Sequence, residues 1–181
     1  KGTNSSYAVI QNATGHALED TLSTGMLIGS GFLFETTAKH ETLSDNTGER
    51  GVLMGGPYGL WQAGYNTLRD MGYNPDFAAR HTVEVSTQVI SKIIGEKGAD
   101  GLVRDLREDL VPWFLGGFRN ALERSEPVFE DLYEKVASGA EAKRVIEANS
   151  LPNYRETLDR ELKEIADSEL GRSATDVRNK R

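Results

Sequence analysis

Apolar residues recur at helical spacing along most of this 181-residue chain, and this pattern constrains the fold more than any other feature. The apolar positions lie three or four residues apart, as they do on one face of an α-helix. They are Leu60, Gly64, Leu68 and Met71; Val85, Val89 and Ile93; Phe129, Leu132, Tyr133 and Val136; Tyr154, Leu158, Leu162 and Ile165; and Leu170, Ala174 and Val177. Residues 32–34 look extended, but a segment so short and isolated does not indicate a sheet. The sequence therefore predicts an all-α fold.

Capping residues agree with this prediction. Asn74-Pro75 is typical of an N-cap followed by proline at the first helical position, and Ser125-Glu126-Pro127 indicates a similar helix start. Residues 105–113 form the least regular segment. Helix ends are expected at Gly72, Gly98 and Gly139. The chain shows no repeat of solenoid length and no low-complexity linker, so residues 1–181 are expected to form a single helical domain.

Composition excludes several classes of protein. A net charge of -7 argues against nucleic acid as the main partner, because proteins that bind phosphate backbones present a basic face. The absence of cysteine excludes disulfides, thiolate zinc sites and a cysteine nucleophile. No run of residues is apolar and long enough to span a bilayer, and the polar residues 1–6 are not a signal peptide. We expect a soluble protein and, since the chain does not begin with methionine, a piece of a longer one.

The segment Ser44-Asp-Asn-Thr-Gly-Glu-Arg50 contains two carboxylates, Asp45 and Glu49, four residues apart. This spacing places both acids on one face of a helix. Two carboxylates held in this way suit Mg²⁺, which binds hard oxygen ligands and keeps waters or substrate oxygens in its remaining positions. An acid pair at this spacing is also common on a solvated helix face or near a helix start. Both interpretations stay open at the level of spacing.

Other candidate residues have ordinary structural explanations beside functional ones. The glycine-rich segment 25–31 has neither the preceding strand nor the lysine of a phosphate-binding loop, so close packing of helices explains it better. Glu84 lies in a mostly apolar helical stretch. If its carboxylate is buried, it must be paired with a cation or bound to a metal. Alternatively, Glu84 lies on the exposed side of an amphipathic helix. The histidines, His16, His40 and His81, lack the spacing of a metal-binding motif. The tryptophans, Trp61 and Trp113, could fill a core or stack on a ligand.

Eight short motifs then appear in one order along the chain. They are Asn4-Ser-Ser-Tyr-Ala-Val9, Gly29-Ser-Gly31, Glu35-Thr-Thr37, Ser44-Asp-x-x-Gly-Glu-Arg50, Leu53-Met-Gly-Gly56, Thr82-Val-Glu84, Pro127-Val-Phe-x-Asp-Leu-Tyr133 and Asn153-Tyr-Arg-Glu156. Together they resemble the C-terminal helical domain of ketol-acid reductoisomerase, most closely in its fungal mitochondrial form. The resemblance implies a knotted helical domain that forms a homodimer to complete its active site. It also implies an upstream NADPH-binding domain of the Rossmann type that this chain does not contain.

The resemblance assigns roles to the acid pair. In the family, the aspartate matching Asp45 bridges two Mg²⁺ ions and the glutamate matching Glu49 binds one of them. The ions polarise the ketone and hydroxyl oxygens of a 2-acetohydroxy acid, which permits an alkyl shift, and hydride transfer from NADPH then reduces the product. This is a step of branched-chain amino-acid biosynthesis, found in mitochondria or plastids of eukaryotes and in the cytoplasm of prokaryotes.

The second half of the family's site departs from the pattern. Two glutamates of the family align with His81 and Val85, neither of which is a carboxylate. Glu84 matches the family, but one residue along an α-helix is a rotation of about 100°, so Glu84 does not simply replace an acid at position 85. His81 and Glu84 are nevertheless the candidate substitute ligands. A serine that holds the substrate carboxylate in the family aligns with Arg107, which could bind a carboxylate through a bidentate contact.

Three functions are consistent with these departures. The first is a reductoisomerase whose second metal site has been rebuilt. The second is a diverged paralogue that reduces another 2-keto acid without isomerisation, which the altered residues 104–113 favour. The third is a non-catalytic dimerisation or scaffold subunit, in which Asp45 and Glu49 are remnants.

Overall fold

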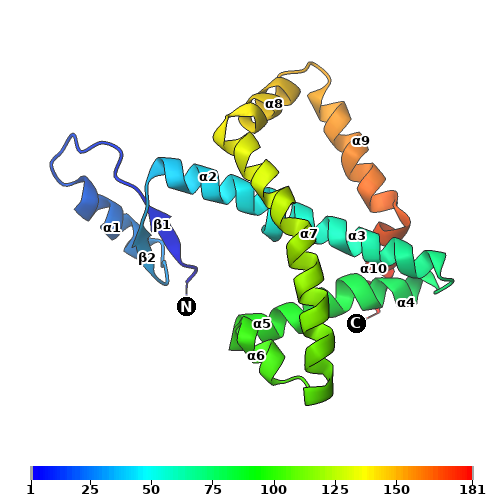
Figure 1. Ribbon diagram of the computed structural model, residues 1–181. Coiled ribbons are helices and arrows are strands. Elements are labelled where there is room, and N and C mark those ends of the chain that lie inside the picture. Colours follow the sequence, from blue (N-terminus) through cyan, green and yellow to red (C-terminus); the bar gives the residue numbers. More distant parts are fainter. Residues whose placement is uncertain (1, 181) are drawn as a thin grey trace.

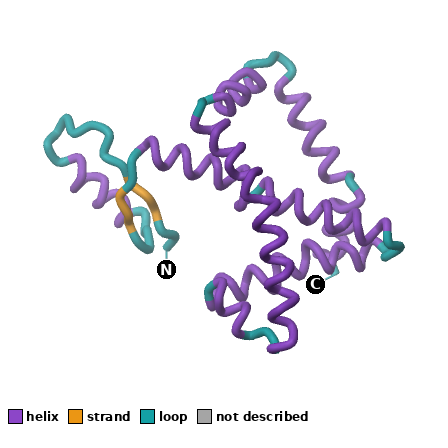
Figure 2. Tube along the Cα trace, viewed as in Figure 1, coloured by secondary structure: helices purple, strands orange, loops and turns teal. Residues whose placement is uncertain are grey.

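The computed structural model describes residues 2–180, which form mostly helices joined by short turns (Figures 1 and 2). The N-terminal elements are β1 (Ser5–Tyr7), α1 (Ala17–Leu27), β2 (Leu33–Glu35), α2 (Ala38–Gly48), the π-helical segment η1 (Glu49–Leu53) and α3 (Gly55–Asp70). The central ones are α4 (Pro75–Ala79), the π-helical segments η2 (Arg80–Glu84) and η3 (Ser86–Ile90), α5 (Ser91–Lys97), α6 (Ala99–Arg104) and the short 3₁₀ helix η4 (Glu108–Leu110). The C-terminal ones are α7 (Val111–Ala137), α8 (Ala140–Asn149), α9 (Tyr154–Asp167) and α10 (Glu169–Asn179).

The helical fold class predicted from the sequence is confirmed, with one exception near the N-terminus. β1 and β2 pair in parallel, with Ser5 opposite Leu33 and Tyr7 opposite Glu35. The extended stretch was expected, but the sheet was not. The strand that pairs with the extended stretch, β1, is three residues long, serine-rich and distant in sequence, so no local alternation of apolar residues indicates it. None of the described helices is long and apolar enough to cross a membrane.

The glycine-rich segment 25–31 allows close packing, as predicted, but against a strand rather than a helix. Gly25 is buried in α1, and a Cβ atom built there would lie 2.6 Å from Cδ2 of Leu33. Any side chain at this position would therefore push α1 away from β2.

The predicted helix boundaries are mostly confirmed. The Asn74 side chain accepts a hydrogen bond of 2.8 Å from the N–H of Phe77, and Pro75 occupies the first position of α4. Gly72, Gly98 and Gly139 follow α3, α5 and α7 and have φ values of 90°, 80° and 76°. Only glycine adopts this left-handed backbone without strain, so these residues end their helices.

The predicted helix start at Ser125-Glu126-Pro127 is wrong. Pro127 lies inside α7, which begins earlier, at Val111, and already has Pro112 in its first turn. A proline inside a helix removes one N–H donor and crowds the preceding turn, which usually costs stability. Pro127 is exposed, so water can hydrate the carbonyl group that loses its partner. The irregular segment predicted over 105–113 is correspondingly shorter, because helix resumes at Val111.

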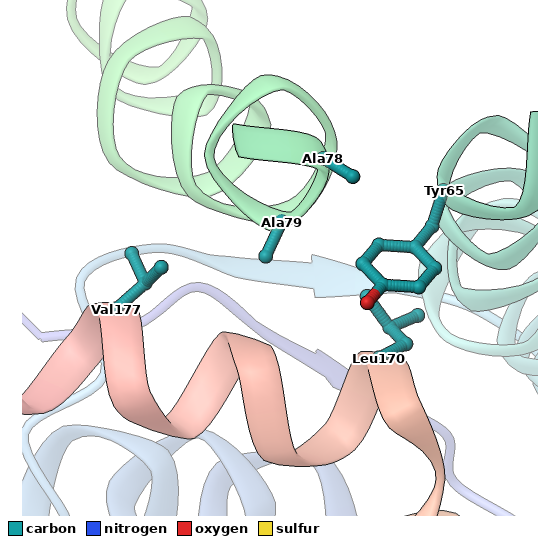
Figure 3. Close-up of a cluster of buried hydrophobic side chains, with 5 residues drawn as sticks. All are labelled: Tyr65, Ala78, Ala79, Leu170 and Val177. Carbon is teal, nitrogen blue, oxygen red and sulfur yellow. The ribbon is translucent and has the colours of Figure 1, made fainter. Parts of the chain in front are cut away.

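The buried core of the described residues lies where the last helix meets the middle of the chain (Figure 3). Leu170 and Val177 of α10 face Ala78 and Ala79 of α4 and Tyr65 of α3, and all five are at most 2% exposed. The Tyr65 hydroxyl also forms a hydrogen bond of 3.1 Å with Ser173 of α10. The small alanine side chains let α10 approach α4 closely.

Most of the predicted apolar stripes lie on helices, but apart from Leu170 and Val177 of α10 their residues are not fully buried within one chain. Leu60, Met71 and Val89 are exposed, and Trp113 is 82% exposed rather than in a core. The helical spacing therefore predicted the secondary structure correctly and did not identify which faces a single chain covers.

A half-buried ion pair connects α8 to η1. The Nε atom of Arg50 lies 2.9 Å from Oε1 of Glu141, and Arg144 binds the same carboxylate. The hydrogen bonds from Arg144 and Arg50 lower the pKa of Glu141 from 4.5 to about 2. Arg50 also donates to the backbone carbonyl of Asn46 at 3.0 Å.

We expect Leu170→Ala to lower the free energy of unfolding by about 2–5 kcal/mol, because it leaves a cavity in the core between α10 and α4. Leu162→Ala, on the exposed side of α9, is the matched control and should change it by about 0.5 kcal/mol or less. Urea unfolding followed by circular dichroism measures both. Equal losses of unfolding free energy in Leu170→Ala and Leu162→Ala would show that Leu170 does not contribute to a buried core.

Glu141→Gln should make the chain less stable than the wild type at neutral pH. Because the pKa of Glu141 is depressed in the folded state, its contribution is present above pH 4.5 and is lost as the pH falls towards 2. The difference in stability between the two proteins should therefore shrink over this range, as measured by denaturant unfolding at a series of pH values. Glu130→Gln, at an exposed position of α7, controls for the loss of one negative charge.

Candidate functional site

Asp45 and Glu49 lie in one continuous helical run at the junction of α2 and η1. The N–H of Glu49 donates to the carbonyl of Asp45, so the two residues are one helical turn apart and share a side of the helix. Asp45 is exposed and Glu49 is half-buried. Within residues 2–180, neither carboxylate has an ion pair or a side-chain hydrogen bond. Both carboxylates are thus available to a cation from outside the chain.

The backbone changes its hydrogen bonding at Glu49. The N–H of Met54 donates to the carbonyl of Glu49 at 3.2 Å, a separation of five residues that defines a π-helical turn. Such turns are rare and occur frequently at functional sites. Arg50, the remaining charged residue of the motif, points to Asn46 and Glu141 and does not neutralise the acid pair.

His81 lies on a second π-helical turn, η2, with its ring orientation fixed. Its Nδ1 atom lies 2.9 Å from the carbonyl oxygen of Phe77, and its ring stacks on that of Phe77 with 3.8 Å between centroids. A carbonyl oxygen only accepts hydrogen bonds, so Nδ1 carries the proton. In neutral His81, the free lone pair is therefore on Nε2, as in many histidine ligands of metals. The side chain is exposed.

Glu84 is half-buried and already has a cationic partner. Its carboxylate lies 3.1 Å from the Arg80 guanidinium, which also binds Asp76 at 2.9 Å. The carboxylate is therefore paired within its own helix, which explains how an acid is accommodated in this apolar stretch. Val85, the other position that departs from the family pattern, is exposed.

One chain does not bring the two half-sites together. No group of three or more histidine, aspartate or glutamate side chains in residues 2–180 is arranged to hold a metal ion. The acid pair on α2 and η1 and the His81–Glu84 segment on η2 are therefore separate features of the single chain.

Arg107 lies on the surface between α6 and η4, with its guanidinium bound to Asp109. The Arg107 Nε and Asp109 Oδ1 atoms are 3.0 Å apart. This ion pair raises the pKa of Arg107 and lowers the pKa of Asp109. The guanidinium must leave Asp109 before it can bind a substrate carboxylate in a bidentate manner.

A pocket of about 360 Å³ opens next to η1 and was not indicated by the sequence motifs. Its wall includes Gly51, Trp61, Ser86 and Phe129. Trp61 is half-buried and donates from Nε1 to the Ser86 hydroxyl at 3.1 Å, so it combines the packing and pocket-lining roles left open by the sequence. These residues come from different elements, so no local spacing could have identified them.

Comparison with known proteins identifies the family. Residues 38–181 match the family model described as the C-terminal domain of ketol-acid reductoisomerase. A relative named ketol-acid reductoisomerase (NAD(+)), from Desulfosudis oleivorans, is 45% identical over 98% of this chain and 50% of its own length. The mitochondrial ketol-acid reductoisomerase of Neurospora crassa is 42% identical over the whole chain and 45% of its own length. The chain thus spans about half the length of these relatives, and bacterial and fungal proteins are similarly close to it.

A solved structure supports the fold. The structure of an NADH-preferring ketol-acid reductoisomerase from an uncultured archaeon aligns with a TM-score of 0.83 at 21% identity, over 97% of this chain and 53% of that one. The order of the sequence motifs, the helical fold and the family match agree. The chain belongs to the ketol-acid reductoisomerase family, through its C-terminal domain.

Proposed function

We propose that this chain is the helical, metal-binding part of an enzyme with ketol-acid reductoisomerase activity. Such an enzyme moves an alkyl group within a 2-acetohydroxy acid and reduces the product, in branched-chain amino-acid biosynthesis. The observation that carries this proposal is the pair of carboxylates of Asp45 and Glu49, one helical turn apart and without a cationic partner among the described residues. Family membership supports it.

The acid pair fits a divalent cation of the Mg²⁺ type. Both side chains offer hard carboxylate oxygens, and Arg50 is held away from them by Glu141 and Asn46. A bound cation would supply Lewis-acid polarisation of the substrate's ketone and hydroxyl oxygens. Asp45 and Glu49 would hold one or two such ions, and they would also fix the position of the substrate through them. Two carboxylates fill only part of the coordination shell of such an ion, so further protein ligands must come from elsewhere.

A second copy of the chain is the proposed source of that contribution. Many helices keep apolar side chains exposed in one chain, among them Leu60, Val89 and Leu122. Exposed apolar surface on this scale is typical of a protein interface. In a homodimer, His81 and Glu84 of the second copy are the candidate ligands, with Nε2 of His81 already free to coordinate. Glu84 would first have to leave Arg80.

The coenzyme would bind outside this chain. We propose an upstream nucleotide-binding domain of the Rossmann type that delivers a nicotinamide cofactor. NADPH was expected, but relatives are named both NAD(+) and NAD(P)(+) forms, so the choice between NADH and NADPH is open. Fungal relatives are named mitochondrial and plant relatives chloroplastic. We propose the mitochondrial matrix or a plastid if the source is eukaryotic, and the cytoplasm otherwise.

A second candidate function is reduction of a 2-keto acid without isomerisation. It is favoured by the imidazole at His81, the apolar Val85, and the Arg107–Asp109 pair at the position expected for a substrate-binding serine. In this case Arg107 would recognise the substrate carboxylate. A non-catalytic dimerisation subunit is the third possibility.

Oxidation of the nicotinamide cofactor by the full-length polypeptide containing this chain separates these functions. With Mg²⁺, we expect turnover of 2-acetolactate and of 3-hydroxy-3-methyl-2-oxobutyrate, which needs reduction but no alkyl shift. Turnover of the second compound alone would support a reductase without isomerisation. Turnover of neither, in a folded protein that binds the cofactor, would contradict both enzymatic proposals.

Asp45→Asn and Glu49→Gln should each lower the rate of turnover of 2-acetolactate by about 100-fold or more, because each removes a charged metal ligand. Binding of Mn²⁺, measured by electron paramagnetic resonance, should weaken in parallel. Asp70→Asn, at an exposed position near the end of α3, should leave both properties unchanged. Unchanged Mn²⁺ binding in the Asp45 and Glu49 variants would show that these carboxylates are not ligands.

His81→Glu should shift the metal preference of the full-length protein from Mn²⁺ towards Mg²⁺, because imidazole favours Mn²⁺ over Mg²⁺ more than a carboxylate does. Pulsed electron paramagnetic resonance of bound Mn²⁺ should show coupling to an imidazole nitrogen that the variant loses. His40→Glu, at an exposed position of α2, is the matched histidine control. Nitrogen coupling that persists in His81→Glu would exclude His81 as the ligand.

A further inference from the structure

Three aromatic rings form a stacked column along α4 and η2. Tyr73, Phe77 and His81 follow one another at intervals of four residues, the spacing that brings side chains together on a helix. The ring centroids of Tyr73 and Phe77 are 4.9 Å apart, with 14° between the ring planes. Those of Phe77 and His81 are 3.8 Å apart, with 19° between the planes. The imidazole is therefore the last ring of the column, and one of its faces is covered.

Packing of the core does not account for this column. Ala78 and Ala79, which follow Phe77, are at most 1% exposed and belong to the core cluster. By contrast, Tyr73 and Phe77 remain 45% and 37% exposed and are not among the side chains that pack against that cluster. Two half-open aromatic side chains bury little apolar area in the core, so their main contact is the stack that ends at His81.

The column is anchored at its base by the turn between α3 and α4. The N–H of Tyr73 donates to the carbonyl of Leu68 at 3.1 Å, and the Arg69 guanidinium donates to the carbonyl of Tyr73. Asn74 caps α4 by accepting a hydrogen bond from the N–H of Phe77. The backbone that carries the first two rings is thus fixed before the helix reaches His81.

Two contacts with Phe77 determine the direction of the imidazole. The carbonyl of Phe77 lies 2.9 Å from Nδ1 of His81, which fixes the tautomer of the neutral ring, and the ring of Phe77 lies against one imidazole face, which fixes the plane. Rotation of the imidazole about its Cβ–Cγ bond would break both contacts. The lone pair of Nε2 is therefore held in one direction. Because no histidine, aspartate or glutamate cluster of residues 2–180 completes a metal site there, any metal ion at Nε2 needs ligands from another chain.

We propose that Phe77 is a positioning residue for His81, and that Tyr73 supports it, so that the aromatic column presents Nε2 to a metal ion. The proposal deepens the proposed function and rests on it for the identity of the group that binds at Nε2. Histidine ligands of metals are usually oriented by a hydrogen bond from the other ring nitrogen to a carbonyl or carboxylate. Here an aromatic face is added to that hydrogen bond. An imidazole that is already oriented loses less conformational freedom when it binds the ion.

Nuclear magnetic resonance of the metal-free, full-length polypeptide tests the orientation of the ring. With isotope labels in the histidine rings, and with His81→Gln to assign the signal, the nitrogen shifts report the tautomer. We expect neutral His81 to show the Nδ1–H tautomer alone in the wild type and both tautomers in Phe77→Leu, where the ring is free to rotate. Phe77→Tyr, which keeps an aromatic ring, should resemble the wild type. A single tautomer in Phe77→Leu, or a mixture in the wild type, would overturn the proposal.

Mn²⁺ binding to the full-length polypeptide tests whether Phe77 acts through His81. Phe77→Leu should weaken binding by about tenfold, the loss typical when a group that orients a metal ligand is removed. Tyr73→Leu should weaken it less, and Phe77→Tyr should restore it. In a His81→Gln background, Phe77→Leu should have no further effect, because the two residues act as one unit. Phe118→Leu, in the stacked and exposed pair Phe114–Phe118 of α7, is the matched control and should leave binding unchanged.

The outcomes of the two measurements separate the positioning role from the proposed function. An equal loss from Phe77→Leu in both backgrounds would show that Phe77 supports the fold and not His81, which would overturn the positioning role. Mn²⁺ binding that is the same in wild type and His81→Gln would contradict both the proposed ligand and its positioning residue. Binding that depends on His81 but is unaffected by Phe77→Leu would overturn the positioning role alone and leave the proposed function intact.

Discussion

The packing of α10 against α3 and α4 is the contact on which the rest of the helical body depends. It joins the end of the chain to its middle through five buried side chains and the hydrogen bond between Tyr65 and Ser173. Ion pairs reinforce the edges of this contact, with Glu169 bound to Arg69 at 2.9 Å and Lys180 bound to Asp76 at 2.6 Å. Asp76 in turn binds Arg80, the first residue of η2. The last helix of the chain therefore supports the turn that carries His81 and Glu84.

Both candidate half-sites contain π-helical turns, at Glu49–Leu53 and Arg80–Glu84. A turn closed by a bond across five residues is wider than an α-helical turn. The rotation of about 100° per residue, which separated Glu84 from position 85 in the sequence argument, belongs to an ideal α-helix. In this π-helical segment, the side chains at positions 84 and 85 therefore need not differ in direction by that angle. The directions of His81 and Glu84 follow instead from their contacts with Phe77 and Arg80.

Much of the secondary structure was predictable because its signals are local. The Asn74 cap, the three glycine helix ends and the helical stripes depend on residues within one or two turns of each other. Pro127 shows the limit of such signals, since proline is common at helix starts yet here lies within a long helix. β1 shows another limit, because its partner strand is distant in sequence. For the candidate site, the common face of Asp45 and Glu49 was predictable from their spacing, whereas the pairing of Arg107 with Asp109 and the orientation of His81 were not.

The sequence by itself determined the helical character of the chain, most helix boundaries, the placement of the acid pair and the motifs of its family. These features depend on backbone preferences and spacing, which neighbouring residues specify. Only the tertiary structure decided which apolar faces are buried and that residues 2–37 form a strand–helix–strand unit. It also decided that Arg50 binds Glu141, so that Asp45 and Glu49 have no ionic partner among residues 2–180. Each of these depends on contacts between residues far apart in the chain, and the period of a helix carries no information about its partner.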